Sequence, residues 1–392
     1  MKTVILLIGL LFSTFSLQAQ DYEDVMSEAY WKIWNSDVQA SINKNIEQYR
    51  KGDAELNIPS GVTVKIEQLS HSFIFGGNIF LFGQLETTQQ NRQYENTFGA
   101  LFNSATLPFY WKTLEPEQGK PRYTAGSSYI FRRPPVDPIL EFCESNKIMT
   151  KGHAIIYGMR RWGHPDWMPS DRKEMEFYFE KHIQELALRY KDRIQIWDVV
   201  NEPMDDGKTS DIKTGKGKTD LASDEFYWQD YFLTPKDYAV EAFKLARQYG
   251  NPDDKLFIND YNLEYNLNKC DGLIKYVEYI ESKGAIVDGI GTQMHIAIDS
   301  NKDNIAQMFQ KLGATGKLIK VSELDIKVNT SSPTTENLAQ QAEMYQYVID
   351  MYKKYIPVDK QYGITIWGVS DNEKEHVNWI PNDAPFPRLP FM

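Results

Sequence analysis

Apolar runs and amphipathic segments alternate along the chain from about residue 72 to its end. Eight of the runs are short and rich in β-branched and aromatic residues, the composition of buried parallel strands. They are residues 72–80, 101–106, 149–157, 194–201, 255–259, 287–295, 318–324 and 363–368. Strict alternation of strand and helix over about 300 residues predicts an α/β protein with one catalytic domain, a (β/α)8 TIM barrel.

The segments between these runs show the 3.6-residue period of helices with one apolar face. One predicted helix, with Ser170 as its N-cap, has its apolar positions at Met175, Phe179, Ile183, Leu186 and Tyr190. Another, which begins at Pro333, has them at Leu338, Ala342, Tyr345, Ile349 and Tyr352. A doubly wound open sheet is the alternative fold, but it requires a glycine-rich phosphate loop after an early strand. The stretch Phe75-Gly76-Gly77-Asn78 does not supply one.

Two regions precede the predicted barrel. Residues 1–20 combine a basic start, an apolar run and small residues near Ala19, as a signal peptide does. The apolar run is shorter than the ~20 residues that span a bilayer, so we expect export with cleavage near Ala19 or Gln20, and no membrane span. Residues 21–70 predict an N-terminal helix and an extended lead-in, and residues 71–392 predict the catalytic barrel.

The composition of the chain limits the classes of ligand that it can bind. The net charge is −11 and no long basic run occurs, so nucleic acid and anionic membranes are poor partners, and a neutral or basic ligand fits better. Aromatic residues make up 13% of the chain, and their rings can stack on sugars or pack a core. Cys143 and Cys270 lie in separate predicted helices, so we expect two free thiols, with a single bridge as the alternative. We expect a monomer.

Functional residues of a (β/α)8 barrel lie at the carboxyl ends of its strands. Here these ends carry polar and aromatic residues, as a sugar-binding cleft does. They are Asn78, Thr106, His153 to Tyr157, Asn201, Glu202, Asn259, Asp260, Tyr261, Asn262, Gln293, His295, Glu323, Asp325 and Trp367. The segment 204–229, after the fourth run, is rich in Gly, Lys and Asp. We interpret it as a loop on this face that is either solvated or shapes the cleft.

Two glutamates predict the chemistry. Glu202 and Glu323 each follow an apolar strand and can face each other across the barrel mouth. Retaining hydrolysis of a glycosidic bond needs such a pair, about 5–5.5 Å apart, one as acid/base and one as nucleophile. His295 could keep Glu323 ionised, with Asp325 orienting His295. Two alternatives remain open: each glutamate merely caps a strand or joins a surface ion pair, or His153, His295 and the acids hold a metal. No paired histidine spacing supports a metal, so we expect neither metal nor cofactor.

Several motifs in order resemble those of glycoside hydrolase family 10, the endo-β-1,4-xylanase family. They are Gly152-His153-Ala154, Pro165-Asp166-Trp167, Trp197-Asp198-Val199-Val200-Asn201-Glu202, Phe257-Ile258-Asn259-Asp260-Tyr261-Asn262, Gly291-Thr292-Gln293-Met294-His295-Ile296, Ser322-Glu323-Leu324-Asp325-Ile326 and Ile366-Trp367-Gly368-Val369-Ser370-Asp371.

The resemblance implies a retaining double displacement on a β-linked polysaccharide or oligosaccharide, with Glu202 as acid/base and Glu323 as nucleophile. It implies that Asn201 binds the 2-hydroxyl of the sugar at the reacting centre. The other implied substrate-binding residues are His153, Tyr157, Tyr261, Gln293, His295, Trp367 and Trp379, and Asp325 is implied as a supporting residue.

Three departures from the family pattern bear on specificity. An acidic-Asn-acidic-x-Lys cluster after the second strand, on the glycone side, is replaced by residues 105–112, with Tyr110 at the lysine position. A Trp-His pair is replaced by Tyr157-Gly158, and the chain ends before the last helix of the barrel. Since lost hydroxyl contacts change specificity more than chemistry, a decorated xylan or another β-glycoside is a possible substrate. A glycan-binding barrel with weak activity is the remaining alternative.

Overall fold

Parallel strands close into a barrel. The computed structural model describes residues 36–49, 55, 57–65, 72–169, 171–207, 211–213, 232–330 and 334–368. Its strands are β1 (Phe75–Asn78), β2 (Ser104–Pro108), β3 (Met149–Tyr157), β4 (Ile196–Asn201), β5 (Lys255–Asp260), β6 (Gly289–Thr292), β7 (His295–Ala297), β8 (Leu318–Lys327) and β9 (Gln361–Ile366). Strand β1 pairs with β2 and β9, and β6 pairs with β5 and β8, so the sheet closes on itself. These pairings are all parallel, which confirms the predicted (β/α)8 barrel.

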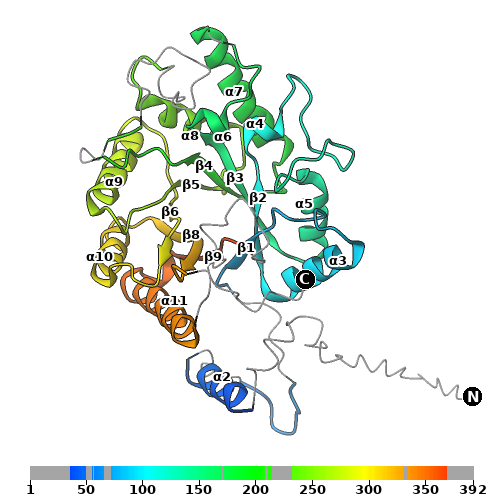
Figure 1. Ribbon diagram of the computed structural model, residues 1–392, viewed down its shortest axis with the longest axis vertical. Coiled ribbons are helices and arrows are strands. Elements are labelled where there is room, and N and C mark those ends of the chain that lie inside the picture. The colour runs from blue at the N-terminus through cyan, green and yellow to red at the C-terminus, as the bar shows by residue number, and fades with distance from the viewer. Residues whose placement is uncertain are drawn as a thin grey trace, which may run out of the picture.

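Helices follow the strands and cover the outside of the barrel (Figure 1). They are α2 (Ser36–Tyr49), α3 (Thr88–Leu101), α4 (Trp111–Leu114), α5 (Val136–Ser145), α6 (Arg160–Gly163), α7 (Arg172–Arg189), α8 (Asp237–Tyr249), α9 (Leu267–Ser282), α10 (Lys302–Gly313) and α11 (Thr335–Tyr355), with a 3-10 turn η3 (Val358–Lys360). The short helices α4 and α6 come directly after β2 and β3, so they lie at the carboxyl ends of these strands. Helix α2 falls within the predicted N-terminal region and is drawn apart from the ring in Figure 1.

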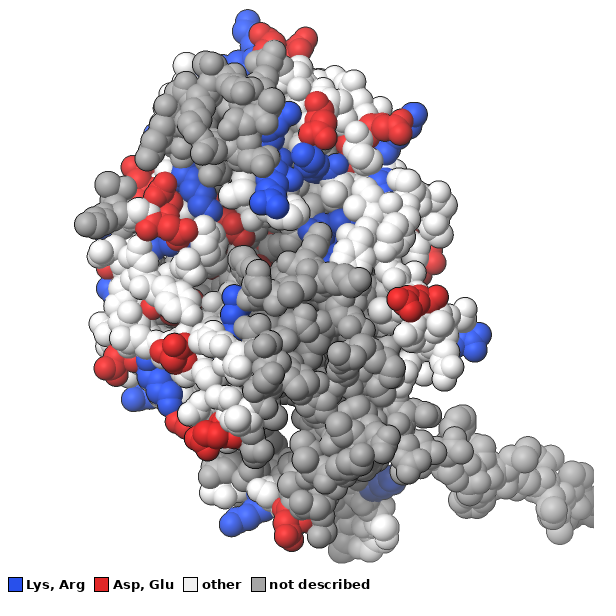
Figure 2. Space-filling model, viewed as in Figure 1, with Lys and Arg blue, Asp and Glu red and all other residues white. Residues whose placement is uncertain are grey.

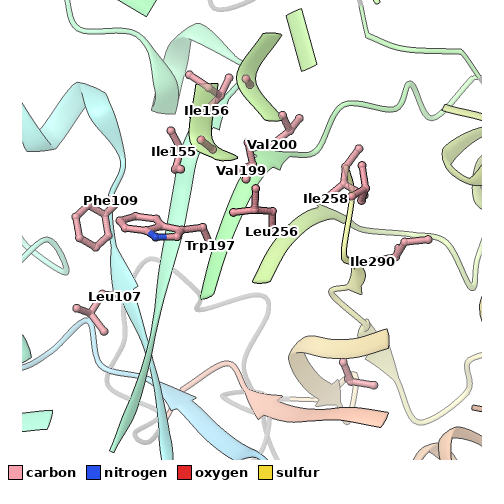
Figure 3. Packing of buried hydrophobic residues seen from close by; sticks show 14 of the residues in the cluster. Leu107, Phe109, Ile155, Ile156, Trp197, Val199, Val200, Leu256, Ile258 and Ile290 are labelled. Carbon is pink, nitrogen blue, oxygen red and sulfur yellow. The ribbon is translucent and has the colours of Figure 1, made fainter. Parts of the chain in front are cut away.

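The apolar strand runs supply the core (Figure 3). Trp197 on β4 is 3% exposed, and its ring meets that of Phe109 at 5.0 Å in an edge-on arrangement. Gly152 on the neighbouring strand β3 lies under this ring, since a Cβ there would come within 2.2 Å of it. A side chain at position 152 would therefore displace Trp197, the start of the strand that carries Glu202.

Helix α7 has the apolar face that the sequence predicts. Met175, Phe179, Ile183, Leu186 and Tyr190 are all buried. Its N-cap is Asp171, whose carboxylate accepts from the backbone amides of residues 173 and 174. The predicted N-cap, Ser170, lies outside the described residues.

The predicted apolar face of α11 is partly correct. Tyr352 is buried as predicted, and Tyr345 and Ile349 are half-buried against the core, but Ala342 is exposed. The side chain of Leu338 lies outside the described ones. Gln341, Met344 and Val348 are also buried, so the face is centred about one position from the predicted one. Gln341 is tolerated inside because its amide donates to the Ile326 carbonyl of β8 at 2.6 Å. The helix begins after the N-cap Thr334, and the predicted start at Pro333 lies outside the described residues.

Three strand predictions need correction. The run 287–295 forms two strands, β6 and β7, because the chain leaves the ladder at Gln293 and Met294, where Met294 has a φ of 59°. Leu101 ends helix α3 rather than starting a strand, so β2 begins at Ser104. Strand β1 starts at Phe75, three residues later than predicted, because its ladder with β9 begins at the pair Phe75 and Ile364.

Cys143 on α5 and Cys270 on α9 are both buried and free, as predicted. In the described part of the chain, no helix has the length and apolar character needed to cross a membrane. The predicted signal peptide, Trp379 and the chain end lie outside the described residues.

Candidate active site

Glu202 lies at the barrel mouth, directly after β4. Its backbone φ of 53° is in the left-handed region, and its amide donates to the carbonyl oxygen of Asn259 at 2.7 Å. The Tyr157 hydroxyl donates to Oε2 at 2.6 Å and the Gln293 amide donates to Oε1 at 3.0 Å. Donors on both oxygens hold the carboxylate in one orientation.

Glu323 lies within β8 and is 3% exposed. The Asn259 amide donates to its Oε1 at 2.7 Å, and Nε2 of His295 lies 3.4 Å from its Oε2. Nε2 of His153 lies 4.0 Å from Oε1. Asp325 holds the other ring nitrogen of His295, Nδ1, at 2.9 Å. The predicted arrangement, in which Asp325 orients His295 toward Glu323, is therefore present.

His295 is positively charged at neutral pH. Burial by itself lowers the pKa of its imidazole, but the carboxylates of Asp325 and Glu323 outweigh burial and raise the pKa to about 10. The imidazolium faces Oε2 of Glu323, so it helps to hold this side chain in one orientation.

Asn259, at the end of β5, links the two glutamates. Its Nδ2 donates to Oδ1 of Asn201 at 2.9 Å as well as to Glu323. The Gln293 amide lies 3.4 Å from the same Asn201 oxygen and also donates to Glu202. Glu202 and Glu323 thus belong to one hydrogen-bond network. Sequence reasoning placed Asn259 at a strand end but not among the site residues, because its partners come from other strands.

A buried charged layer lies beneath the mouth. Oδ2 of Asp198 on β4 lies 2.7 Å from Nδ1 of His153 and 2.6 Å from Nζ of Lys151. Burial raises the pKa of Asp198, but Lys151 and His153 outweigh burial and hold this pKa below its ordinary value. Burial and the charge of Lys151 lower the pKa of Lys320 to about 7. Sequence reasoning missed Lys151 and Lys320, which are polar positions inside apolar strand runs.

The segment after Glu202 folds back over it. Met204 and Ile212 form an antiparallel bridge, which brings Lys213 to the mouth. The Nζ of Lys213 lies 3.7 Å from Oε2 of Glu202 and 4.6 Å from the centre of the Tyr261 ring. The described residues of the loop predicted at 204–229 therefore shape the cleft. Lys213 was missed because lysine in a Gly-, Lys- and Asp-rich segment is usually solvated.

Tyr261 is held on the Lys213 side of Glu202. Its hydroxyl donates to Oδ2 of Asp206 at 2.6 Å. The Nζ of Lys269 lies 2.8 Å from Oδ1 of Asp206 and 3.0 Å from Oδ1 of Asp260. The same nitrogen lies over the Tyr261 ring, 3.6 Å from its centre. These contacts make one side of the mouth a rigid polar surface.

Glu202 is ionised in the free protein. Burial raises the pKa of its carboxyl, but the charge of Lys213 outweighs burial, together with the hydrogen bonds from Tyr157 and Gln293 and the charge of Lys269. The pKa therefore lies below its ordinary value. A carboxyl in this setting accepts a proton only when its surroundings change, for example when a substrate displaces the donors.

Aromatic rings form the opposite side of the mouth. We call this set the aromatic wall, and it consists of Phe80, Tyr110, Tyr157 and Trp367. Trp367 meets Phe80 at 5.3 Å and His153 at 5.5 Å, both edge-on. Tyr110 meets the His153 ring at 5.5 Å. Phe80 was missed by sequence reasoning, and Tyr110 was noted only as a departure from the family pattern, because nothing local shows that residues 80 and 110 meet.

The predicted site residues come together as a group. Those described at the mouth are Glu202, Glu323, His153, Tyr157, Asn201, Tyr261, Gln293, His295, Trp367 and Asp325. Within the described ranges, no three His, Cys, Asp or Glu side chains are arranged to hold a metal ion. His153 and His295, the histidines of the metal alternative, each contact a carboxylate through Nδ1.

Comparisons with known proteins agree with this geometry. A model of glycosyl hydrolase family 10 matches residues 71–387. Endo-1,4-beta-xylanase C of Paenibacillus barcinonensis is 29% identical over 290 residues, which are 69% of this chain and 25% of that protein. This chain thus spans only a quarter of the length of that relative. Endo-1,4-beta-xylanase B of the same organism is 28% identical over 337 residues, which are 82% of this chain and 91% of that protein.

Solved structures share the fold. The structure of a GH10 protein from Paenibacillus barcinonensis superposes with a TM-score of 0.64 at 26% identity. The superposition covers 80% of this chain and 88% of the other. The modest identity fits a divergent sequence on a common barrel.

Proposed function

Because this chain belongs to glycosyl hydrolase family 10, we propose that it is a retaining endo-β-1,4-xylanase, acting on β-1,4-xylan or a decorated form of it. The observation that carries this proposal is the hydrogen-bond network that joins Glu202 to Glu323 across the barrel mouth. A double displacement needs two carboxylates that act on one glycosidic bond, and this network brings Glu202 and Glu323 to the same site. The two relatives described above are named as xylanases.

In the first step of the proposed reaction, Glu323 is the nucleophile. The Asn259 amide and the His295 imidazolium hold its carboxylate in one orientation. One carboxylate oxygen attacks the anomeric carbon, and the bond to the leaving oxygen breaks. Asn201 shares the donor Asn259 with Glu323 and is the proposed partner of the sugar 2-hydroxyl. Hydrogen bonds to this hydroxyl strengthen in the transition state.

Glu202 is the proposed acid/base. It gives a proton to the leaving oxygen in the first step and takes one from water in the second, as water displaces Glu323 from the sugar. In the free protein, the Tyr157 hydroxyl and the Gln293 amide hold its carboxylate at the mouth. His153 and Trp367 are proposed to contact the sugar ring at the reacting centre.

Hydrolysis of another β-glycoside is the second candidate function. The aromatic wall favours it, since Phe80 and Tyr110 present rings on the side where family members carry polar residues. We further propose that the protein is exported after removal of residues 1–20 and acts as a monomer without a cofactor.

Two isosteric variants test the assignment. E202Q and E323Q should each reduce kcat on xylan by about 1,000-fold or more, because each removes a carboxylate that the mechanism needs. E278Q on the exposed face of α9 is the matched control and should retain full activity. The fold of each variant is checked by circular dichroism. Product release is measured as reducing sugar, and NMR of the first product should show the β-anomer. Full activity in E202Q or E323Q, or an α-anomeric first product, would refute the proposal.

A further inference from the structure

A guanidinium lies against the aromatic wall. The Cζ of Arg133 lies 4.0 Å from the centre of the Tyr110 ring and 5.4 Å from that of Phe80. The Cζ of Arg132 lies 5.5 Å from the same Phe80 ring. Arg133 is 6% exposed, and its Nη1 donates to the Arg132 carbonyl at 2.8 Å. A charge that is shielded from water acts more strongly on its neighbours than a charge at the surface.

This charge lies one ring away from the reacting centre. Tyr110 separates Arg133 from His153, which in turn lies 4.0 Å from Glu323. Burial raises the pKa of Tyr110, the charge of Arg133 opposes this shift, and the charge of Glu323 adds to it. The Tyr110 hydroxyl is thus within the field of both groups. By the family resemblance, Tyr110 stands on the glycone side, so Arg133 does too.

An amide without a partner lies at the end of the strand that leads to this wall. Asn78 ends β1 and is 0% exposed, and neither its Nδ2 nor its Oδ1 has a hydrogen-bond partner among the described residues. A Cβ at Gly77 would meet the rings of Phe98 and Phe102 on the α3 side. Because neighbouring residues of a strand face opposite sides, Asn78 faces the barrel interior. A buried amide without a partner is destabilising, and a bound polar group would supply the missing hydrogen bond.

The charge near the wall differs from that of the whole chain. The chain has a net charge of −11, yet Lys and Arg side chains gather over α4 and α6 beside the hollow in Figure 2. On α6, the Cζ of Arg161 lies 5.0 Å from the Trp162 ring centre. The Cζ of the buried Arg133 lies 6.0 Å from the same ring. The net charge favoured a neutral or basic ligand, but this local field favours an anionic one.

We propose that the glycone side of the cleft binds a sugar that carries an anionic substituent, a carboxylate or a sulfate ester, with Arg133 as the residue that selects it. The guanidinium fork matches the paired oxygens of either group. The amide of Asn78 supplies a further donor, and the rings of the wall pack on the sugar face. This proposal rests on the proposed function and names its substrate class.

The test compares substrates that differ only in charge. Wild-type kcat/KM is measured on glucuronic-acid-substituted xylo-oligosaccharides and on the same oligosaccharides after reduction of the carboxyl to an alcohol. A sulfated set and its desulfated counterpart form the second arm. For at least one anionic set we expect kcat/KM to exceed that of its neutral counterpart by about 10-fold or more, because hydrogen bonds to charged groups are stronger. The arm that shows the preference identifies the anion.

Variants then test whether Arg133 is responsible for the preference for anionic substrates. R133M, which keeps much of the apolar stem, should bring the anionic-to-neutral ratio close to one, and R133K should retain part of it. N78D, which puts a negative charge beside the anion, should invert the ratio. R193M, which removes an arginine paired with Glu144 in the outer part of the barrel, is the matched control and should keep the wild-type ratio.

Failure of this proposal differs from failure of the proposed function. If the neutral oligosaccharides are cleaved as fast as both anionic sets, the protein is a xylanase without anion selection, and the inference is wrong. If no substrate is cleaved, the proposed function is wrong. Calorimetry with the E323Q variant then tests the inference, by comparing its affinity for the anionic oligosaccharides with its affinity for the neutral ones. Equal affinity for anionic and neutral ligands would overturn it. A ratio that R133M leaves unchanged would also overturn the role of Arg133.

Discussion

The ammonium nitrogen of Lys213 lies 3.7 Å from Oε2 of Glu202, and only 8% of the lysine side chain is exposed. A cation this close stabilises the carboxylate over the protonated acid. Yet the proposed acid must hold a proton when it meets the leaving oxygen. The relationship between these two residues therefore sets the pH range in which the protein can act as a glycosidase.

Replacement of Lys213 by methionine should move the alkaline limb of the pH profile upward. Without the cation, the pKa of Glu202 rises, so the acid stays protonated to higher pH. We expect the alkaline limb of kcat/KM to rise by about one pH unit. The measurement is kcat/KM on xylan from pH 4 to 10. K213R, which keeps the charge, should resemble the wild type, and K311M on α10 controls for a general loss of charge. An unchanged alkaline limb in K213M would show that Lys213 does not act on Glu202.

Replacement of Asn259 by aspartate should disconnect the two glutamates. The change keeps the shape but puts a carboxylate where an amide donates to Glu323 at 2.7 Å. Repulsion between the two carboxylates displaces the Glu323 side chain, so the maximum kcat/KM should fall by about 100-fold. Steady-state kinetics on xylan measure this loss. N304D on α10 is the control. Activity within threefold of the wild type would contradict the linking role of Asn259.

The ion pair between His295 and Asp325 should make stability depend on pH. The folded pKa of His295, about 10, lies above the ~6.5 of an unfolded histidine. Its contribution is therefore complete below pH ~6.5 and is lost as pH rises through 10. D325N should lower the free energy of unfolding by about 3 kcal/mol at pH 6, and by less at pH 10.

Urea unfolding of the wild type and D325N at pH 6 and pH 10 measures this difference. D253N, at an exposed position before β5, is the control and should shift stability by less than about 0.5 kcal/mol at both pH values. An equal loss in D325N at pH 6 and pH 10 would show that the pair does not titrate as described.

The buried face of α11 can be tested with two neighbouring substitutions. Q341E replaces a buried amide that donates to the Ile326 carbonyl, so it should reduce stability by about 3 kcal/mol. A342E changes an exposed position and should alter stability by less than about 0.5 kcal/mol. Thermal and urea unfolding measure both. A larger loss of stability in A342E than in Q341E would show that Ala342, and not Gln341, lies on the buried face.

The apolar pattern predicted the barrel because its information is local. A parallel strand that is buried on both faces is mostly apolar along its length. Each strand can therefore be recognised from its own residues, without knowledge of its neighbours. The pattern was less reliable for α11, where Gln341 is buried and Ala342 is exposed. The hydrogen bond from Gln341 to β8 allows this polar side chain to be buried. The periodicity of apolar residues cannot predict such a bond.

The sequence by itself determined the alternation of strands and helices, and with it the expectation that Glu202, His295 and Glu323 meet at one edge of the barrel. Glu202 directly follows β4, but Glu323 lies inside β8, which continues to Lys327, past the predicted end at residue 324. Only the tertiary structure decided their partners. Lys213 reaches Glu202 because the chain doubles back between Met204 and Ile212. Arg133 reaches Tyr110 from the other end of the connection between β2 and α5. Such contacts depend on barrel closure and on the direction of each side chain, which residue types in sequence order do not specify.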